Sequence, residues 1–308
     1  MRIASFLPSA TETLYELGVG GDIVGVTHEC KYPARARKKP QVIHPSFDAA
    51  KMTGRQIDGK IVELLRAGQD IYVVDEKLLK KADPELIVAQ GLCEVCSPFT
   101  KEISRAVSML GGSSRPDVLV LDPHDLDDIL ASIMDLAEKV GRVKEGRRLV
   151  ASLQKRIDAV RAIKKAKRRP KVMCVEWVNP LFTAGHWVPQ MVEYAGGVNG
   201  AGVAGEQSRR MDIDEIIKFD PDIIVMMPCG FGIKRTVEEM KVLRGDRKWE
   251  SLRAVKNGDV YAVESGAYFS KPSPRTITGL EILARIIHPE AVTKIKVPKG
   301  SFKKVKSY

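Results

Sequence analysis

The chain has 308 residues, of which 44% are hydrophobic, and its formal net charge at pH 7 is +11. This length exceeds one ordinary core and fits two domains, and no apolar run reaches the ~20 residues that a membrane-spanning helix requires. Much of the positive charge lies in residues 164–169 and 294–306, without the interleaved aromatic residues and glycines of single-strand binders. A membrane-spanning protein is therefore excluded, and nucleic acid is the least favoured partner.

Short apolar runs and amphipathic runs alternate through the first half of the chain. Apolar runs predict strands, and apolar residues three or four apart predict helices. We expect strands at 3–7, 23–27, 71–74 and 118–121, and helices at 57–65, 76–81, 103–110 and 125–140. Ser9 and Glu12 have the spacing of a capping box, which predicts a further helix that begins at Ser9. The basic stretch before residue 57 reads as irregular.

One long amphipathic helix is predicted over residues 144–167, where apolar residues recur three and four apart and basic residues fill the other face. A second series of elements follows Pro170. We expect strands at 172–175 and 260–263, and helices at 213–219 and 277–287. The segment after Pro289 is polar and basic, and no element is predicted there.

A repeated motif gives the domain organisation. Residues 83–91 and 220–230 each read as a helix end, a proline, a fully apolar strand and a glycine loop. Such apolar strands are typical of parallel sheets buried on both faces. The sequence therefore predicts an α/β protein with two similar lobes of parallel sheet. The lobes are expected at 1–140 and 170–290, with a connecting helix at 141–169, a basic tail at 291–308 and a ligand cleft between the lobes.

Ligands of open α/β sheets bind beyond the carboxyl ends of the strands. Loops in this position hold four of the five cysteines, namely Cys30, Cys93, Cys96 and Cys229, whereas Cys174 lies inside an apolar strand and is expected to be an inert core residue. The four thiolates suit a zinc ion or an iron–sulfur cluster. The CxxC pair at 93 and 96 also permits a redox role, or no chemical role at all.

Other catalytic motifs are missing. The sequence has neither a GxSxG nucleophile elbow nor a GxxxxGK[ST] phosphate loop. The glycine-rich run 196–202 follows a helix, which disfavours a dinucleotide fingerprint. His28 and His186 lie in strand-end loops and are the two histidines to test, with His28 a possible metal ligand. His44 and His288 are expected to be structural.

Several segments taken together resemble a known family. The order and spacing of these segments are similar to those of the cobalamin-binding substrate-binding proteins of ABC transporters, in the periplasmic-binding-protein class with a long helix between lobes. The segments are 5–12, 24–27, 32–33, 179–185, 196–199 and 273–275. The resemblance spans nearly the whole chain. It implies two Rossmann-like lobes with parallel sheets, joined by a long helix, that bind one ligand between them without catalysis, and a protein that is a monomer.

The resemblance also implies a ligand wall and a partner. Aromatic and apolar faces with a few donors suit a flat corrinoid. The implied ligand residues are Pro8, Tyr32, Gln90, Phe182, His186, Tyr268, Phe269 and Lys271. An ABC permease is the implied partner, docked by one acidic residue on each lobe. On the C-terminal lobe the acidic docking residue corresponds to Asp214. On the N-terminal lobe the corresponding position is Lys77, with Glu76 beside it, so the acidic pair is incomplete.

The sequence therefore predicts a binding protein for cobalamin or a related corrinoid. The alternative is a metalloprotein, with or without an enzymatic role, that holds an iron–sulfur cluster or zinc through its cysteines. A redox enzyme built on the CxxC pair comes third. No export signal follows Met1. We expect a cytoplasmic protein if Met1 is the native start, and an extracytoplasmic one if a signal peptide was removed.

Overall fold

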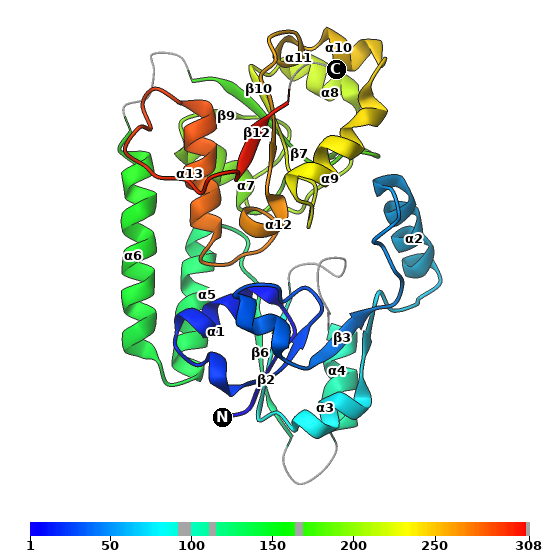
Figure 1. Cartoon of the computed structure of the whole chain (residues 1–308), viewed down its shortest axis with the longest axis vertical. Coiled ribbons are helices and arrows are strands. Elements are labelled where there is room, and N and C mark those ends of the chain that lie inside the picture. Colours follow the sequence, from blue (N-terminus) through cyan, green and yellow to red (C-terminus); the bar gives the residue numbers. More distant parts are fainter. Residues whose placement is uncertain (92–99, 111–114, 164–168, 306–308) are drawn as a thin grey trace. The chain divides into compact units, whose positions relative to one another are not determined.

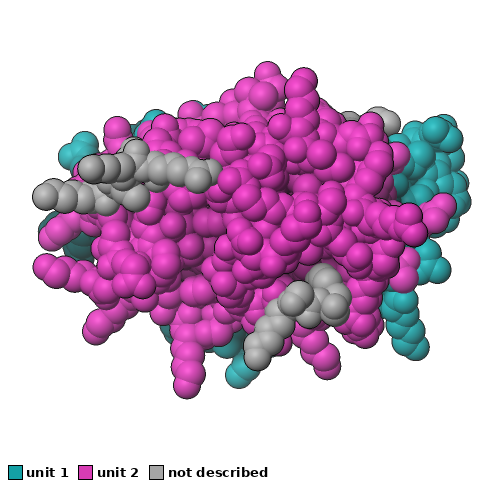
Figure 2. Space-filling model, turned by 90° about the horizontal axis from the view of Figure 1, so that it is seen from above, with its two compact units in different colours: residues 1–52, 56–123, 127–152 teal, residues 53–55, 124–126, 153–308 magenta. Residues whose placement is uncertain are grey.

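A computed structural model describes residues 1–91, 100–110, 115–163 and 169–305 (Figure 1). The chain divides into two compact units, which are coloured separately in Figure 2. Unit 1 comprises residues 1–52, 56–123 and 127–152, and unit 2 comprises residues 53–55, 124–126 and 153–308. Within the described ranges, no helix combines the length and the hydropathy that crossing a bilayer requires.

Unit 1 contains a six-stranded sheet in the order β4-β3-β2-β1-β5-β6. All neighbours are parallel except β3 and β4, which are antiparallel. The strands are β1 (Ile3–Ser5), β2 (Ile23–Thr27), β3 (Gln41–Pro45), β4 (Tyr72–Val74), β5 (Leu86–Gln90) and β6 (Asp117–Leu121). Leu86 and Val88 pack into one hydrophobic cluster, and Ile87 and Ala89 pack into another. This alternation shows that β5 is buried on both faces, as its apolar sequence predicts.

The helices of unit 1 include most of those expected. They are α1 (Pro8–Glu16), α2 (Gly54–Arg66), α3 (Glu76–Ala82), α4 (Thr100–Met109), α5 (Leu126–Lys139) and α6 (Val143–Arg161), with 3-10 turns at Gly20–Asp22 and Ala34–Lys38. The predicted capping box is wrong. Helix α1 begins at Pro8, its N-cap is Leu7, and no side chain caps it. Proline suits the first helical position because that residue has no intrahelical N–H partner, and Ser9 therefore lies inside the helix.

Unit 2 is built around β7 (Lys171–Trp177) and a sheet in the order β12-β11-β10-β7-β8, with β9 paired to β7. Two edge pairs, β7–β8 and β11–β12, are antiparallel. The remaining strands are β8 (Phe182–Thr183), β9 (Val198–Asn199), β10 (Ile223–Met226), β11 (Val260–Val263) and β12 (Phe302–Lys304). The two-lobe α/β fold is thus confirmed, but both sheets are mixed rather than wholly parallel.

Helix α6 begins in unit 1 and ends in unit 2 at Arg161, earlier than the predicted residue 167, and residues 164–168 lie outside the described ranges. The other helices of unit 2 are α7 (Val188–Tyr194), α8 (Ile213–Phe219), α9 (Ile233–Glu239), α10 (Arg247–Ser251), α11 (Arg253–Lys256), α12 (Ser265–Tyr268) and α13 (Thr276–Ile287), with a 3-10 turn at Met240–Leu243. Arg156 of α6 donates to both carboxylate oxygens of Glu281 in α13, across 2.9 and 2.7 Å. This ion pair joins the second half of α6 to the body of unit 2.

The repeated motif has one structural role in both units. Asp83 ends α3 and Asp220 ends α8, each in the left-handed conformation, with φ of 42° and 49°. Each backbone N–H bonds back into its helix, to Leu79 O and Ile216 O. Short polar residues tolerate this conformation, which closes a helix before the proline turns the chain into a strand. The strands that follow, β5 and β10, lie inside their sheets with a parallel neighbour on each side.

Candidate ligand-binding site

Three of the predicted ligand residues lie in unit 1, where β1 runs parallel to both β2 and β5. Pro8 follows β1 and is half-buried. Gln90 is the last residue of β5 and is 5% exposed. Tyr32 lies in the loop after β2 and is 42% exposed. Since the carboxyl ends of parallel neighbours meet at one edge, the fold gives these residues a common edge of the sheet.

The loop after β2 also carries His28 and Cys30. Burial lowers the pKa of the His28 imidazole, although the Glu29 carboxylate lies 3.8 Å from Nε2 and opposes the shift. Cys30 is 2% exposed, and its Sγ lies 3.0 Å from the Thr11 hydroxyl and 3.5 Å from the Thr27 hydroxyl. The Cys30 thiol is therefore embedded in the core of unit 1, next to neutral hydroxyls.

The predicted cysteine centre involves both units and a part of the chain outside the described ranges. Cys93 and Cys96 fall in residues 92–99, which the structure does not describe. Cys229 lies in unit 2, is half-buried, and donates its backbone N–H to Glu176 O. Among the described residues, no group of three histidine, cysteine or acidic side chains is arranged to hold a metal. A centre built from the four cysteines stays a prediction.

Cys174 occupies the core position expected of it. It lies in β7, is 4% exposed, and burial strongly raises the pKa of its thiol. A neutral, enclosed thiol is a poor nucleophile and a poor metal ligand, because both roles require the thiolate.

The predicted ligand residues of unit 2 have different exposures. Phe182, Tyr268 and Lys271 are half-buried, whereas Phe269 is 3% exposed. The Arg210 guanidinium lies 5.6 Å from the centroid of the Phe182 ring, and that of Arg275 lies 5.8 Å from the Tyr268 ring. Phe182 and Tyr268 thus present aromatic surface beside a cation, while the Phe269 ring belongs to the core.

His186 lies between β8 and α7 in an uncommon backbone conformation. Its φ is 52°, in the left-handed region, which few non-glycine residues adopt and which histidine adopts more often than most of them. Two backbone hydrogen bonds maintain this conformation, from His186 N to Glu206 O at 2.6 Å and from Gly205 N to His186 O at 3.0 Å. The imidazole stacks on Trp187 with ring centroids 5.6 Å apart, and Trp187 Nε1 donates to Phe269 O.

Glu176 is a notable polar residue that sequence analysis missed. It follows the apolar run 172–175 near the end of β7, and burial raises the pKa of its carboxyl. The Ser208 hydroxyl donates to its Oε2 across 2.7 Å, and the Gly185 N–H donates to the same oxygen across 3.4 Å. The signal available in the sequence was an acidic residue at the carboxyl end of a buried strand.

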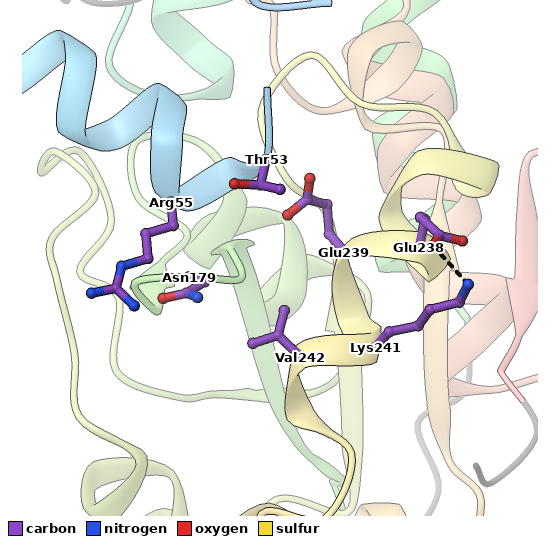
Figure 3. Close-up of a pocket in the computed structure, with 7 residues that line it drawn as sticks. All are labelled: Thr53, Arg55, Asn179, Glu238, Glu239, Lys241 and Val242. Atoms are coloured by element: carbon purple, nitrogen blue, oxygen red, sulfur yellow. Dashed lines mark hydrogen bonds and ion pairs between the residues drawn. The ribbon is translucent and has the colours of Figure 1, made fainter. Parts of the chain in front are cut away.

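A pocket of about 370 Å³ opens in unit 2 beside the first residues of α2 (Figure 3). It is lined by Thr53, Arg55, Asn179, Glu238, Glu239, Lys241 and Val242. The pocket lining has two cationic side chains, Arg55 and Lys241. Lys241 forms an ion pair with Glu238 across 2.6 Å, which neutralises its charge locally. The volume lies at the small end of the range for ligand pockets, and all the lining residues except Val242 have polar or charged side chains.

The Glu239 carboxylate fixes the start of α2. It accepts from Gly54 N at 3.0 and 3.1 Å, and Trp177 Nε1 donates to Gly54 O at 3.2 Å. A carboxylate at a helix N-terminus satisfies a free N–H and complements the helix dipole. A Cβ at position 54 would lie 3.0 Å from Glu239 Oε2, so glycine permits this close approach.

Two α/β units, each built on its own mixed sheet, are the architecture of the two-lobe binding proteins. Residues 3–267 match the family described as "Periplasmic binding protein". This match covers most of the chain, and the protein therefore belongs to the periplasmic binding protein family.

Individual relatives are similar along most of their length. The chain is 26% identical over 296 residues to an uncharacterized ABC transporter substrate-binding lipoprotein of Bacillus subtilis, covering 94% of this chain and 80% of that protein. It is 21% identical over 285 residues to a vitamin B12-binding protein of Vibrio cholerae, covering 91% of this chain and 86% of that protein.

A solved structure with the same fold is a periplasmic heme-binding protein of Pseudomonas aeruginosa. The TM-score is 0.72 with 17% sequence identity, and the match covers 100% of this chain and 99% of that chain. At this level of identity the likeness shows the fold alone.

Proposed function

We propose that this protein is the substrate-binding component of an ABC transporter and that its ligand is a corrinoid of the cobalamin type. One observation carries the proposal, namely the similarity to a vitamin B12-binding protein over 91% of the chain, within a family to which the chain belongs. The Bacillus subtilis relative, described as an ABC transporter substrate-binding lipoprotein, supports the transport role.

The ligand contacts are residues at or beyond the carboxyl ends of the parallel strands, together with Phe182, which opens β8 and pairs with Trp177 at the end of β7. In unit 1 these are Pro8, Tyr32 and Gln90, and in unit 2 they are Phe182, His186, Tyr268 and Lys271. A corrinoid has broad apolar faces and amide side chains, so it requires aromatic surface together with a few donors and acceptors. Phe269 supports this surface from the core, because its backbone carbonyl accepts from Trp187 and its side chain is enclosed.

The permease partner is proposed to contact one acidic residue on each unit. Glu76 opens α3 in unit 1, and Asp214 lies in the first turn of α8 in unit 2. Both carboxylates are exposed and have basic partners, Lys80 at 2.7 Å and Lys248 at 2.7 Å. Exposed ion pairs contribute little to stability, so these carboxylates exchange partners at small cost.

The location follows the proposed role. The Bacillus subtilis relative is described as a lipoprotein and the Pseudomonas aeruginosa protein as periplasmic. These descriptions favour the second of the two predicted locations, outside the cytoplasm.

The second candidate ligand is heme, because the Pseudomonas aeruginosa protein with the same fold is a heme-binding protein. The second candidate function is the metalloprotein with a cysteine-held cluster. The absorption spectrum of the protein purified without oxygen separates them. A corrinoid spectrum supports the proposal, a Soret band supports heme, and broad iron–sulfur charge-transfer absorption that is lost in Cys93→Ser supports the cluster.

A further inference from the structure

Residues 289–305, here called the basic arm, follow α13 in unit 2 and include β12 (Figure 1). Strand β12 pairs antiparallel with β11 at the edge of the sheet. Three side chains of the arm are buried, with Val292 1%, Ser301 2% and Val305 6% exposed. The basic arm is therefore packed onto unit 2, although its sequence is polar and predicts no element.

Hydrogen bonds from other segments of unit 2 fix the path of the basic arm. Arg285 of α13 donates through Nη2 to Val292 O and, across 2.7 Å, to Ile295 O. Glu264, which follows β11, donates its backbone N–H to Ser301 O across 3.0 Å. The backbone is thus held on both sides of the turn that lies between these contacts, and the side chains of that turn extend from a fixed support.

The basic arm carries positive charge that is not neutralised locally. It contains five lysines and one acidic residue, Glu290. Lys304 pairs with Asp259 across 2.9 Å. Within the part of the chain that the structure describes, the four remaining lysines are exposed and form no ion pair, namely Lys294, Lys296, Lys299 and Lys303. A fixed segment of unit 2 therefore presents a cluster of unpaired ammonium groups to solvent.

The residue types of the basic arm favour one kind of anionic partner. The arm has no arginine, the side chain whose planar fork suits bidentate recognition of phosphates in nucleic acids. Its one aromatic side chain, Phe302, is half-buried beside Tyr261, with ring centroids 6.3 Å apart, so it offers no open platform for a stacked base. Lysine ammonium groups are hydrated point charges on flexible stems, and they suit a diffuse, hydrated anionic surface.

We propose that the basic arm binds the anionic phospholipid surface of a membrane. Clusters of about four to eight lysine or arginine residues beside a membrane are a signature of binding to anionic lipid. The attraction acts within about a Debye length, ~8–10 Å at moderate salt, and needs no apolar insertion. The four unpaired lysines of the arm meet this requirement from a single segment of the chain.

The lipid contact goes beyond the proposed function, and its test requires no ligand. An ABC permease lies in a membrane, so a lipid contact keeps a substrate-binding component near its partner. The proposed permease contact in unit 2 is the acidic Asp214, whereas the lipid contact uses lysines. The two contacts therefore rest on residues of opposite charge, and either one can fail without the other.

The first test is co-sedimentation of the full chain with vesicles of equimolar phosphatidylglycerol and phosphatidylcholine, and with vesicles of phosphatidylcholine alone. We expect the wild type to pellet with the anionic vesicles only. The bound fraction should fall steeply between about 0.05 and 0.5 M NaCl, because salt screens the attraction. These measurements use no variant, so they do not depend on how a variant folds.

The second test compares two variants that lose the same charge. The arm variant carries Lys294→Gln, Lys296→Gln, Lys299→Gln and Lys303→Gln. The matched control changes four other lysines of unit 2 that are exposed and, among the described residues, form no ion pair, as Lys155→Gln, Lys218→Gln, Lys234→Gln and Lys256→Gln. We expect the partition coefficient on anionic vesicles to fall at least about tenfold in the arm variant and less than about threefold in the control.

Three results would overturn the proposal. The first is wild-type protein that does not pellet with the anionic vesicles, and the second is an equal loss in the two variants, which would assign the binding to net charge rather than to the basic arm. The third comes from a duplex oligonucleotide added to the vesicle mixture. If the duplex displaces the wild type from the vesicles and does not bind the arm variant, the arm is a nucleic-acid surface instead.

Discussion

The hydroxyl of Ser208 donates a 2.7 Å hydrogen bond to Oε2 of Glu176, a carboxyl whose pKa is raised by burial. The folded protein therefore holds the Glu176 proton more tightly than the unfolded chain does. The resulting stabilisation is fully present below the unfolded pKa of about 4.3 and is lost as the pH rises through the folded pKa.

Replacing Glu176 by Gln tests this linkage, because Gln keeps an acceptor for Ser208 and does not ionise. As the pH rises from about 4.3 through the folded pKa of Glu176, we expect the melting temperature of the wild type to fall relative to that of Glu176→Gln. The measurement is thermal unfolding across a pH series, with the exposed Glu290→Gln as the control. Parallel pH curves for wild type and Glu176→Gln would contradict the assignment.

Tyr268→Ala is expected to weaken cobalamin binding by ~1–3 kcal/mol, which is about 5- to 150-fold, because it removes a half-buried aromatic face. Tyr194→Ala is the matched control. Tyr194 is also half-buried under an arginine, with Arg161 4.6 Å from its ring centroid, but it lies at the end of α7. Equal losses of affinity in both variants would indicate a general effect on folding rather than a ligand contact.

Phe269→Ala should act mainly on stability. The ring is 3% exposed, and a Cβ added at Gly279 of α13 would lie 3.2 Å from Phe269 Cε1. Truncation of a buried phenylalanine costs ~3–5 kcal/mol in the free energy of unfolding. Denaturant unfolding measures this loss, and Phe269→Leu should recover part of it. A variant of wild-type stability with weakened cobalamin binding would instead place the ring in direct contact with the ligand.

The ion pair between α6 and α13 predicts non-additive mutations. The Glu281 side chain is 10% exposed and the Arg156 side chain is 35% exposed. Arg156→Leu leaves the enclosed carboxylate without its cation, so we expect a loss of about 2–4 kcal/mol, below the full cost of a completely buried pair. The double variant Arg156→Leu/Glu281→Leu should recover much of that loss in denaturant unfolding. Additive losses would show that the two side chains are not energetically coupled.

The central strands and their helices were predictable from sequence because their signals are local. Asp83 and Asp220 precede prolines and apolar runs, and both end helices in the left-handed conformation. Of the strands that were not predicted, β12 lies at a sheet edge, whereas β3 lies between β2 and β4. Strand β3 contains His44 and Pro45, and β12 has two lysines in three residues, so neither shows an apolar pattern. These segments are strands because neighbours pair with them, which is a tertiary effect.

The site was predictable only in part. The loops at strand ends were identified because parallel topology fixes where they lie, and this included His186. The His124 ring lies beside that of His186, with centroids 6.3 Å apart, and its Nδ1 donates to Gly205 O, 81 residues away in the chain; no local pattern reports these contacts. The pocket lining likewise joins Arg55 to Glu239 from segments far apart in the chain. Whether Cys30, Cys93, Cys96 and Cys229 share a metal stays a prediction.

The most direct test of the central claim is calorimetric titration of the wild-type full chain with cobalamin. The titration is performed on metal-loaded and metal-stripped protein, with heme as the competing ligand. We expect saturable binding of one cobalamin in both preparations, stronger than any binding of heme. No detectable cobalamin binding in either preparation would contradict the proposed function and favour the cysteine-held cluster.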